Sequence, residues 1–180
     1  YNSDPWQVKR YSEELPREAL RAVFIPIWNC YSFFITYALL DKWVPDDNTG
    51  NPSQIELDRW ILSCLKSSIA EVTSALEQFD VATAAAEITT FIDSLSNWYI
   101  RRSRKRFWKS DSDKDKQCAY ATLYEVLVTL SKLIAPMAPF MAEVMYQNLV
   151  CNIDKRAPES VHLCQWPDAG KLTQESALEN

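Results

Sequence analysis

A cluster of basic residues lies between aromatic residues in the middle of the chain. Residues 97 to 109 read NWYIRRSRKRFWK, with six positive charges and no negative charge, whereas the whole chain has a net charge of −5. Arginine forks bind phosphate through paired hydrogen bonds, and a tryptophan ring can stack on a nucleobase. These residue types predict an RNA-binding or phosphate-binding site made of Arg101, Arg102, Arg104, Lys105, Arg106 and Trp108.

The phase of these residues on a helix adds a constraint. At 100° per residue, the basic side chains other than Arg104 fall within an arc of about 140°. The upstream apolar residues Ile88, Leu95 and Tyr99 project in largely the same direction. A core cannot hold so many unpaired charges, so we expect this helix to extend beyond its bundle or to meet acidic groups or an anionic ligand. Three interpretations stay open: RNA or phosphate binding, contact with an acidic surface of another domain, and a solvated helix face.

Other residue types offer less chemistry. His162 lies in an alternating segment typical of a strand, and Glu13 and Glu14 are placed where they favour the dipole of a helix start. No phosphate-binding loop, nucleophile motif or metal triad occurs in the sequence, so we predict neither a catalytic residue nor a metal site in this chain.

The cysteines and the hydropathy indicate the compartment. The five cysteines form no CxxC pair, which argues against zinc and favours free thiols in a reducing cytoplasm. No apolar run approaches the length of about 18 residues that spans a bilayer, so we expect no membrane partner.

Helical periodicity organises most of the chain. We predict an all-α, antiparallel bundle of about five helices over residues 12–150, with a linker at 1–11 and a partly extended tail at 151–180 that includes a short strand at 160–166. The first helix should kink at Pro26, Asp80 should cap the third helix, and Ser53 with Glu56 should form a capping box for the second. The expected helices cover 12–41, 53–76, 81–109, 117–135 and 140–150.

Four segments carry a family resemblance. LDRWILS at 57–63, LSNWYIRRSRKRFW at 95–108, ATLYEVLVTLSKLIAPMAPFMAEVMYQNL at 121–149 and SVHLCQWP at 160–167 resemble the anticodon-binding region of isoleucyl-tRNA synthetases, which are class I aminoacyl-tRNA synthetases. FIPIWNCYSFFITYA at 24–38 resembles the helix that leads into that region. Valyl- and leucyl-tRNA synthetases share the fold and are the alternative, but the arginine-rich helix favours the isoleucyl family.

The resemblance implies a longer parent enzyme that attaches isoleucine to tRNA(Ile) with ATP and magnesium. It implies that this chain binds the anticodon stem and loop, that its partners are tRNA(Ile) and the catalytic domain of the same polypeptide, and that the parent is a cytoplasmic monomer. Neither the HIGH-type nor the KMSKS-type motif of the family occurs here, so we expect no cofactor in this fragment and no activity from it alone. Docking of the basic helix against the catalytic domain is the alternative role.

Overall fold

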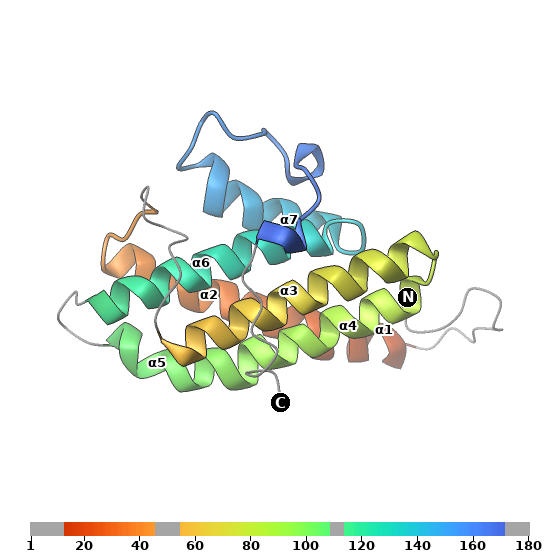
Figure 1. The fold of residues 1–180 in the computed structure, drawn as a ribbon, viewed down its shortest axis with the longest axis horizontal. Helices are drawn as coiled ribbons and strands as arrows, with labels where there is room; N and C mark the ends of the chain where they lie inside the picture. Colours follow the sequence, from red (N-terminus) through yellow and green to blue (C-terminus); the bar gives the residue numbers. More distant parts are fainter. Residues whose placement is uncertain (1–12, 46–54, 109–113, 172–180) are drawn as a thin grey trace.

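The fold is that of a helical bundle. A computed structural model describes residues 13–45, 55–108 and 114–171, and no β-strand occurs among these residues. Figure 1 shows long helices lying side by side, with a shorter helix across one side of the bundle. The predicted all-α bundle is therefore confirmed, whereas the predicted linker at 1–11 lies outside the described residues.

The first helix runs without a break from Glu14 to Leu40 in three segments: α1 (Glu14–Ala19), a π-helical turn η1 (Leu20–Phe24) and α2 (Ile25–Leu40). The π turn precedes Pro26, whose ring would clash with the carbonyl four residues earlier in a regular α-helix. The Ile25 N–H bonds to the carbonyl of Leu20, five residues back. A widened turn thus lies where the sequence predicted a kink.

The same helix corrects an expectation about membranes. Glu14–Leu40 is long and apolar enough to cross a bilayer by length and composition, contrary to the sequence-based expectation. A core helix of a soluble protein meets the same criteria, and one side of this helix is buried in the bundle through Ile27, Cys30, Phe34 and Ala38.

Two antiparallel helices form the next layer. The helix α3 (Glu56–Glu77) lies beside α4 (Val81–Asp93), which continues through the π-helical η2 (Ser94–Ile100) into α5 (Arg101–Trp108) (Figure 1). Asp80 caps α4 as predicted, because its carboxylate accepts a hydrogen bond of 3.0 Å from the Thr83 N–H. The helix α3 begins at Glu56 with Ile55 as its N-cap residue, and Ser53 of the predicted capping box lies outside the described residues.

The remaining helices close the core. α6 (Lys114–Ile134) packs against α2, α3 and α5, and the turn at Pro136 leads into α7 (Pro139–Tyr146) and the π-helical η3 (Gln147–Cys151). The break at Pro136 and Pro139 was predicted. The largest fully buried side chains are Tyr99, Tyr120, Tyr146, Phe91, Phe107, Ile27, Ile61, Leu65, Ile69, Ile92, Leu95 and Leu123.

The C-terminal segment is irregular, so the predicted strand at 160–166 is wrong. Residues 161–163 form a 3₁₀ turn, η4 (Val161–Leu163), and η5 (Ala169–Lys171) follows. The Glu143 carboxylate holds this segment to α7, because it accepts hydrogen bonds from Ser160 Oγ (2.9 Å) and the Val161 N–H (3.0 Å). The second of these bonds satisfies the Val161 N–H without a partner strand. Extended backbone remains at Ser160 and Cys164.

Candidate nucleic-acid interface

The π-helical segment η2 decides which side chains of the basic cluster face solvent. Hydrogen bonds in a π-helix run five residues along the chain instead of four, so each turn takes up more residues than an α turn. The buried side therefore continues through Tyr99, Ile100, Ser103 and Phe107. The expectation that most of the basic side chains share the direction of the core is wrong, and α5 stays packed on the bundle.

The exposed side of η2 and α5 combines cations with two tryptophans. Trp98 is 50% exposed and Trp108 is 56% exposed, and four basic residues between them are exposed as well. This surface, here named the cationic face, consists of Trp98, Arg101, Arg102, Arg104, Lys105 and Trp108. It offers positive charge for phosphates and aromatic rings for bases on one side of a helix.

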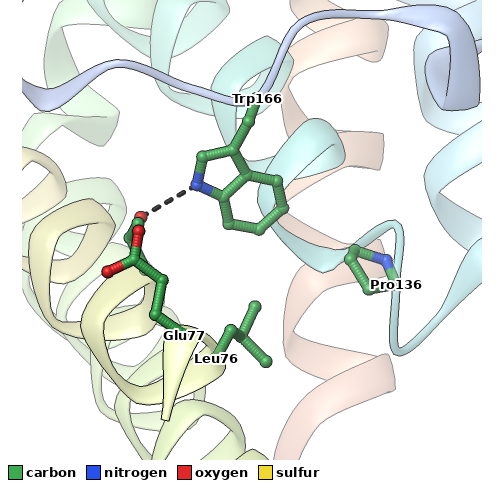
Figure 2. Close-up of a pocket in the computed structure, with 5 residues that line it drawn as sticks. Leu76, Glu77, Pro136 and Trp166 are labelled. Atoms are coloured by element: carbon green, nitrogen blue, oxygen red, sulfur yellow. Dashed lines mark hydrogen bonds between the residues drawn. The ribbon is translucent and has the colours of Figure 1, made fainter. Parts of the chain in front are cut away.

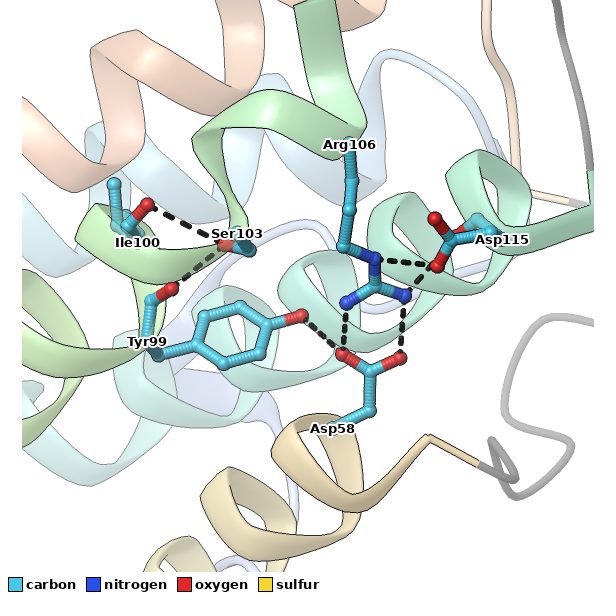
Figure 3. Close-up of polar contacts among 6 residues, drawn as sticks. All are labelled: Asp58, Tyr99, Ile100, Ser103, Arg106 and Asp115. Atoms are coloured by element: carbon cyan, nitrogen blue, oxygen red, sulfur yellow. Dashed lines mark hydrogen bonds and ion pairs between the residues drawn. The ribbon is translucent and has the colours of Figure 1, made fainter. Parts of the chain in front are cut away.

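Arg106 lies elsewhere, although the sequence placed it in the same site. Its guanidinium donates from Nη1 to Asp58 Oδ1 (2.6 Å) and from Nη2 to Asp58 Oδ2 (2.8 Å), as Figure 3 shows. Its Nε donates to Asp115 Oδ1 at 2.7 Å. The Arg106 side chain is only 12% exposed and Asp58 is fully buried. This charge is thus neutralised inside the bundle by two carboxylates of the chain itself.

The buried cluster is completed by Tyr99, whose hydroxyl donates to Asp58 Oδ1 at 2.8 Å (Figure 3). Burial and the neighbouring Asp58 charge raise the pKa of Tyr99 well above its ordinary value. Burial alone would lower the pKa of Arg106, but the hydrogen bonds and charge of Asp58 outweigh it and raise this pKa. Tyrosine stays neutral and arginine stays charged, so the cluster holds α5 against α3 and α6.

The two aromatic residues at the end of α5 differ in role. Phe107 is buried, with its ring centroid 5.1 Å from that of Phe33 and 4.9 Å from that of Tyr120. Trp108 points to the surface, and its indole Nε1 donates to the hydroxyl of Tyr37 at 2.7 Å. The hydrogen bond to α2 fixes Trp108 at the edge of the cationic face, where a base could reach it.

Trp98 is the member of the cationic face that the sequence analysis missed. The guanidinium carbon of Arg102 lies 4.6 Å from the centroid of the Trp98 ring, within the range of a cation–π contact. The spacing of a tryptophan four residues before an arginine could have signalled this pair, because such residues are neighbours on a helix surface.

A second ion pair supports the region next to the cationic face. The buried Lys116 Nζ lies 2.6 Å from Asp41 Oδ2, and Tyr120 donates to the same carboxylate. Burial opposes ionisation of Asp41, but the hydrogen bonds from Lys116 and Tyr120 lower its pKa overall. These contacts fasten the C-terminal end of α2 to α6 and so support Tyr37, the partner of Trp108.

The pocket beside Trp166 is a weaker candidate for ligand binding. It has a volume of about 370 Å³ and is lined by Thr73, Leu76, Glu77, Pro136 and Trp166 (Figure 2). The Trp166 indole donates to Thr73 Oγ1 at 2.8 Å. Its only charged lining residue is an acid, which suits no phosphate. The Trp166 contact fastens the C-terminal segment to α3.

Metal chemistry has no candidate among the described residues. No group of three or more histidine, cysteine, aspartate or glutamate side chains there could hold a metal ion. His162 is exposed on η4, and all five cysteines are free thiols.

Comparison with known proteins identifies the family of this chain. Residues 58–180 match the family model described as the anticodon-binding domain of tRNA ligase. The chain is 48% identical over 176 residues to an isoleucine–tRNA ligase of Dehalococcoides mccartyi (strain CBDB1), and these residues are 98% of this chain and 17% of the relative.

Two further relatives have the same name and similar identity. The chain is 45% identical to the isoleucine–tRNA ligase of Clostridium acetobutylicum, covering 99% of this chain and 17% of the relative, and 44% identical to that of Thermus thermophilus, covering 98% and 17%. It therefore spans about one sixth of the length of these relatives. The match of residues 58–180 to the family model shows that this chain belongs to the anticodon-binding domain family of tRNA ligases, and its helical bundle is consistent with that family.

Proposed function

We propose that this chain is the part of an isoleucine–tRNA ligase that binds the anticodon stem and loop of tRNA(Ile), with the cationic face as the contact surface. The names of the relatives support the assignment of isoleucine as the amino acid, and the family supports tRNA as the binding partner.

The observation that carries the proposal is the placement of Arg101, Arg102, Arg104 and Lys105 on one exposed helix side of a chain with net charge −5. On an acidic protein, an RNA is attracted only where positive charge is concentrated, so one focused surface suits a partner held at one place. The inward-facing Arg106 belongs to the support of that surface, because its charge is already matched by Asp58 and Asp115.

The chemistry of the whole ligase belongs to other parts of the longer protein. There, ATP and magnesium would activate isoleucine before its transfer to tRNA, in a cytoplasmic and monomeric enzyme. The residues of this chain do not fit these groups, since the sequence has no phosphate-binding loop and the described part holds no carboxylate cluster for a metal. We therefore assign to this chain a binding role and no catalytic step.

A salt titration tests the proposal. Binding of tRNA(Ile) to the chain is measured at increasing salt concentration, and four phosphate contacts predict a slope of log K against log salt of about −3. Replacing Arg101, Arg104 and Lys105 by glutamine should reduce the slope to about −1. The matched control is Arg156→Gln, which removes a surface charge in the segment after α7 that pairs with Asp154.

The outcomes separate the alternatives. A flat slope, or one that the triple variant leaves unchanged, contradicts the proposal. If the cationic face instead docks against the rest of the ligase, the triple change in the full-length enzyme lowers its stability and leaves tRNA affinity unchanged. Equal affinity for tRNA(Val) and tRNA(Ile) would leave RNA binding standing and remove the isoleucine assignment at this surface.

A further inference from the structure

Trp98 occupies an unusual position for a large apolar side chain. It lies in η2, where its neighbours Leu95, Tyr99 and Ile100 are buried while half of its own surface faces solvent. Burying a tryptophan removes a large apolar area from water, so the exposed ring leaves stabilisation unused in the isolated chain. A partner that covers the ring would recover it.

The side chains of Arg102 and Arg106, one helical turn apart, lie in different places. Arg106 turns inward to Asp58, whereas the guanidinium of Arg102 stays at the surface over the Trp98 ring, 4.6 Å from its centroid. A guanidinium is planar and weakly hydrated, so it can stack on an aromatic ring and also on a base. The contact places an aromatic ring and a planar cation together at the surface.

The position of this pair along the helix complements that of Trp108. Trp98 and Trp108 are ten residues apart, which is about 15 Å along a helix axis at 1.5 Å per residue. The exposed cations Arg101, Arg104 and Lys105 lie between them. Stacking sites separated by phosphate-binding cations are the arrangement by which proteins bind unpaired nucleotides.

We propose that Trp98 and Arg102 form a stacking platform for one unpaired base of the bound RNA, at the opposite end of the cationic face from Trp108. This inference rests on the proposed function. Positive charge alone would predict only phosphate contacts. The proposal adds a contact with a base and gives it to Trp98, which carries no charge.

The test combines substitutions with modified RNA. The probe is a stem–loop RNA whose loop carries an isoleucine anticodon, and a series of such RNAs has each loop base removed in turn. Trp98→Ala should weaken binding of the intact RNA by about fivefold to 150-fold, the range for loss of one stacked base, without changing the salt slope. Trp98→Phe keeps an aromatic ring and should restore most of the affinity.

Substitutions at Arg102 separate stacking from charge. Arg102→Lys keeps the charge and the salt slope but loses the planar guanidinium, so it should weaken binding. Arg102→Gln should also reduce the slope by about 0.7. Phe140→Ala is the matched control, because Phe140 is an exposed aromatic residue on α7 and outside the cationic face.

The RNA series supplies the deciding result. Removing one particular base should abolish the difference between the original chain and Trp98→Ala, whereas removing the other bases should preserve it. If the original chain binds RNA with the expected salt slope and Trp98→Ala binds equally well, the platform is contradicted and the proposed function stands. Loss of affinity that is the same for every RNA in the series also contradicts the platform. No salt-dependent binding by the original chain contradicts the proposed function itself.

Discussion

The two terminal nitrogens of Arg106 lie 2.6 and 2.8 Å from the two carboxylate oxygens of Asp58, a residue 48 positions earlier in the chain. This paired contact joins α5 to α3 at a fully buried carboxylate. It separates Arg106 from the four other basic residues of the segment 101–106 and makes it part of the internal framework. The other basic residues of that segment remain on the surface.

Asp58→Asn should lower the free energy of unfolding by about 3 kcal/mol. The amide turns a donor group toward Arg106 and leaves its buried charge without its main partner, while Asp115 still compensates in part. Urea unfolding followed by circular dichroism measures the change. Asp154→Asn, which removes an exposed ion pair with Arg156, serves as the control and should have no measurable effect. A loss below about 1 kcal/mol for Asp58→Asn would show that the cluster is not a structural support.

The helices themselves were largely predictable, because apolar residues recur at helical spacing along each of them. The Asp80 cap followed from a side-chain type at the start of such a pattern. The N-cap residue of α3 is Ile55, an apolar residue that the sequence pattern did not indicate. The short alternation at 160–166 resembled a strand, but Glu143 holds this segment as a turn through a contact that no local pattern contains.

Stability in acid should depend on Glu143. Burial raises its pKa, but hydrogen bonds from Gln147, Ser160 and the Val161 N–H outweigh burial and lower the pKa below its ordinary 4.5. A lowered folded-state pKa contributes stability that is present above pH 4.5 and is lost as the pH falls through the folded-state value. Glu143→Gln should therefore be less stable by about 1 kcal/mol at neutral pH, with the difference shrinking below pH 4.5.

Urea unfolding between neutral pH and acid measures this difference. Glu159→Gln is the control, because the Glu159 side chain takes no part in the contacts that hold η4, and its profile should follow that of the original chain. A constant difference between Glu143→Gln and the original chain at every pH would contradict the assignment.

Cys30 should resist alkylation in the folded chain. Burial raises the pKa of this thiol to about 12, against a smaller opposing effect of its hydrogen bond with Ser96, and its side chain is 2% exposed. The reactive thiolate is therefore scarce and enclosed. Iodoacetamide labelling at pH near 8, read by peptide mass spectrometry, should modify half-buried Cys118 much faster than Cys30, and denaturant should remove the difference. Equal rates in the folded chain would show that α2 opens readily.

Tyr37→Phe should weaken RNA binding by about twofold to tenfold, the range for loss of one neutral hydrogen bond. Without the Tyr37 hydroxyl, the Trp108 indole loses its partner and must be ordered when RNA binds. The ring of the substituted residue still packs on Phe33, so the fold is kept. The affinity of Tyr37→Phe for tRNA(Ile) is measured together with that of the original chain and of Trp108→Ala. Trp108→Ala should lose more affinity than Tyr37→Phe. Equal losses from both variants would mean that Trp108 acts only through its hydrogen bond.

The site was only partly predictable. The residue types in 97–109 indicated phosphate and base binding, but the direction of each side chain depends on η2. A π turn is defined by its backbone hydrogen bonds, and residues 94–100 carry no composition that distinguishes it from an α turn. Likewise, Asp58 and Asp115 meet Arg106 only after α3 and α6 have packed against α5, so the sequence could not show which cation is internal.

Hydroxyl-radical footprinting of the chain with and without tRNA(Ile) tests the cationic face most directly. Oxidation of Trp98 and Trp108 should slow several-fold when the RNA is added, because both rings are exposed in the chain alone. Oxidation of Phe79 and Phe140, which are 89% and 88% exposed outside the cationic face, should not change. Protection of Phe79 or Phe140 with both tryptophans left reactive would place the RNA elsewhere and contradict the account.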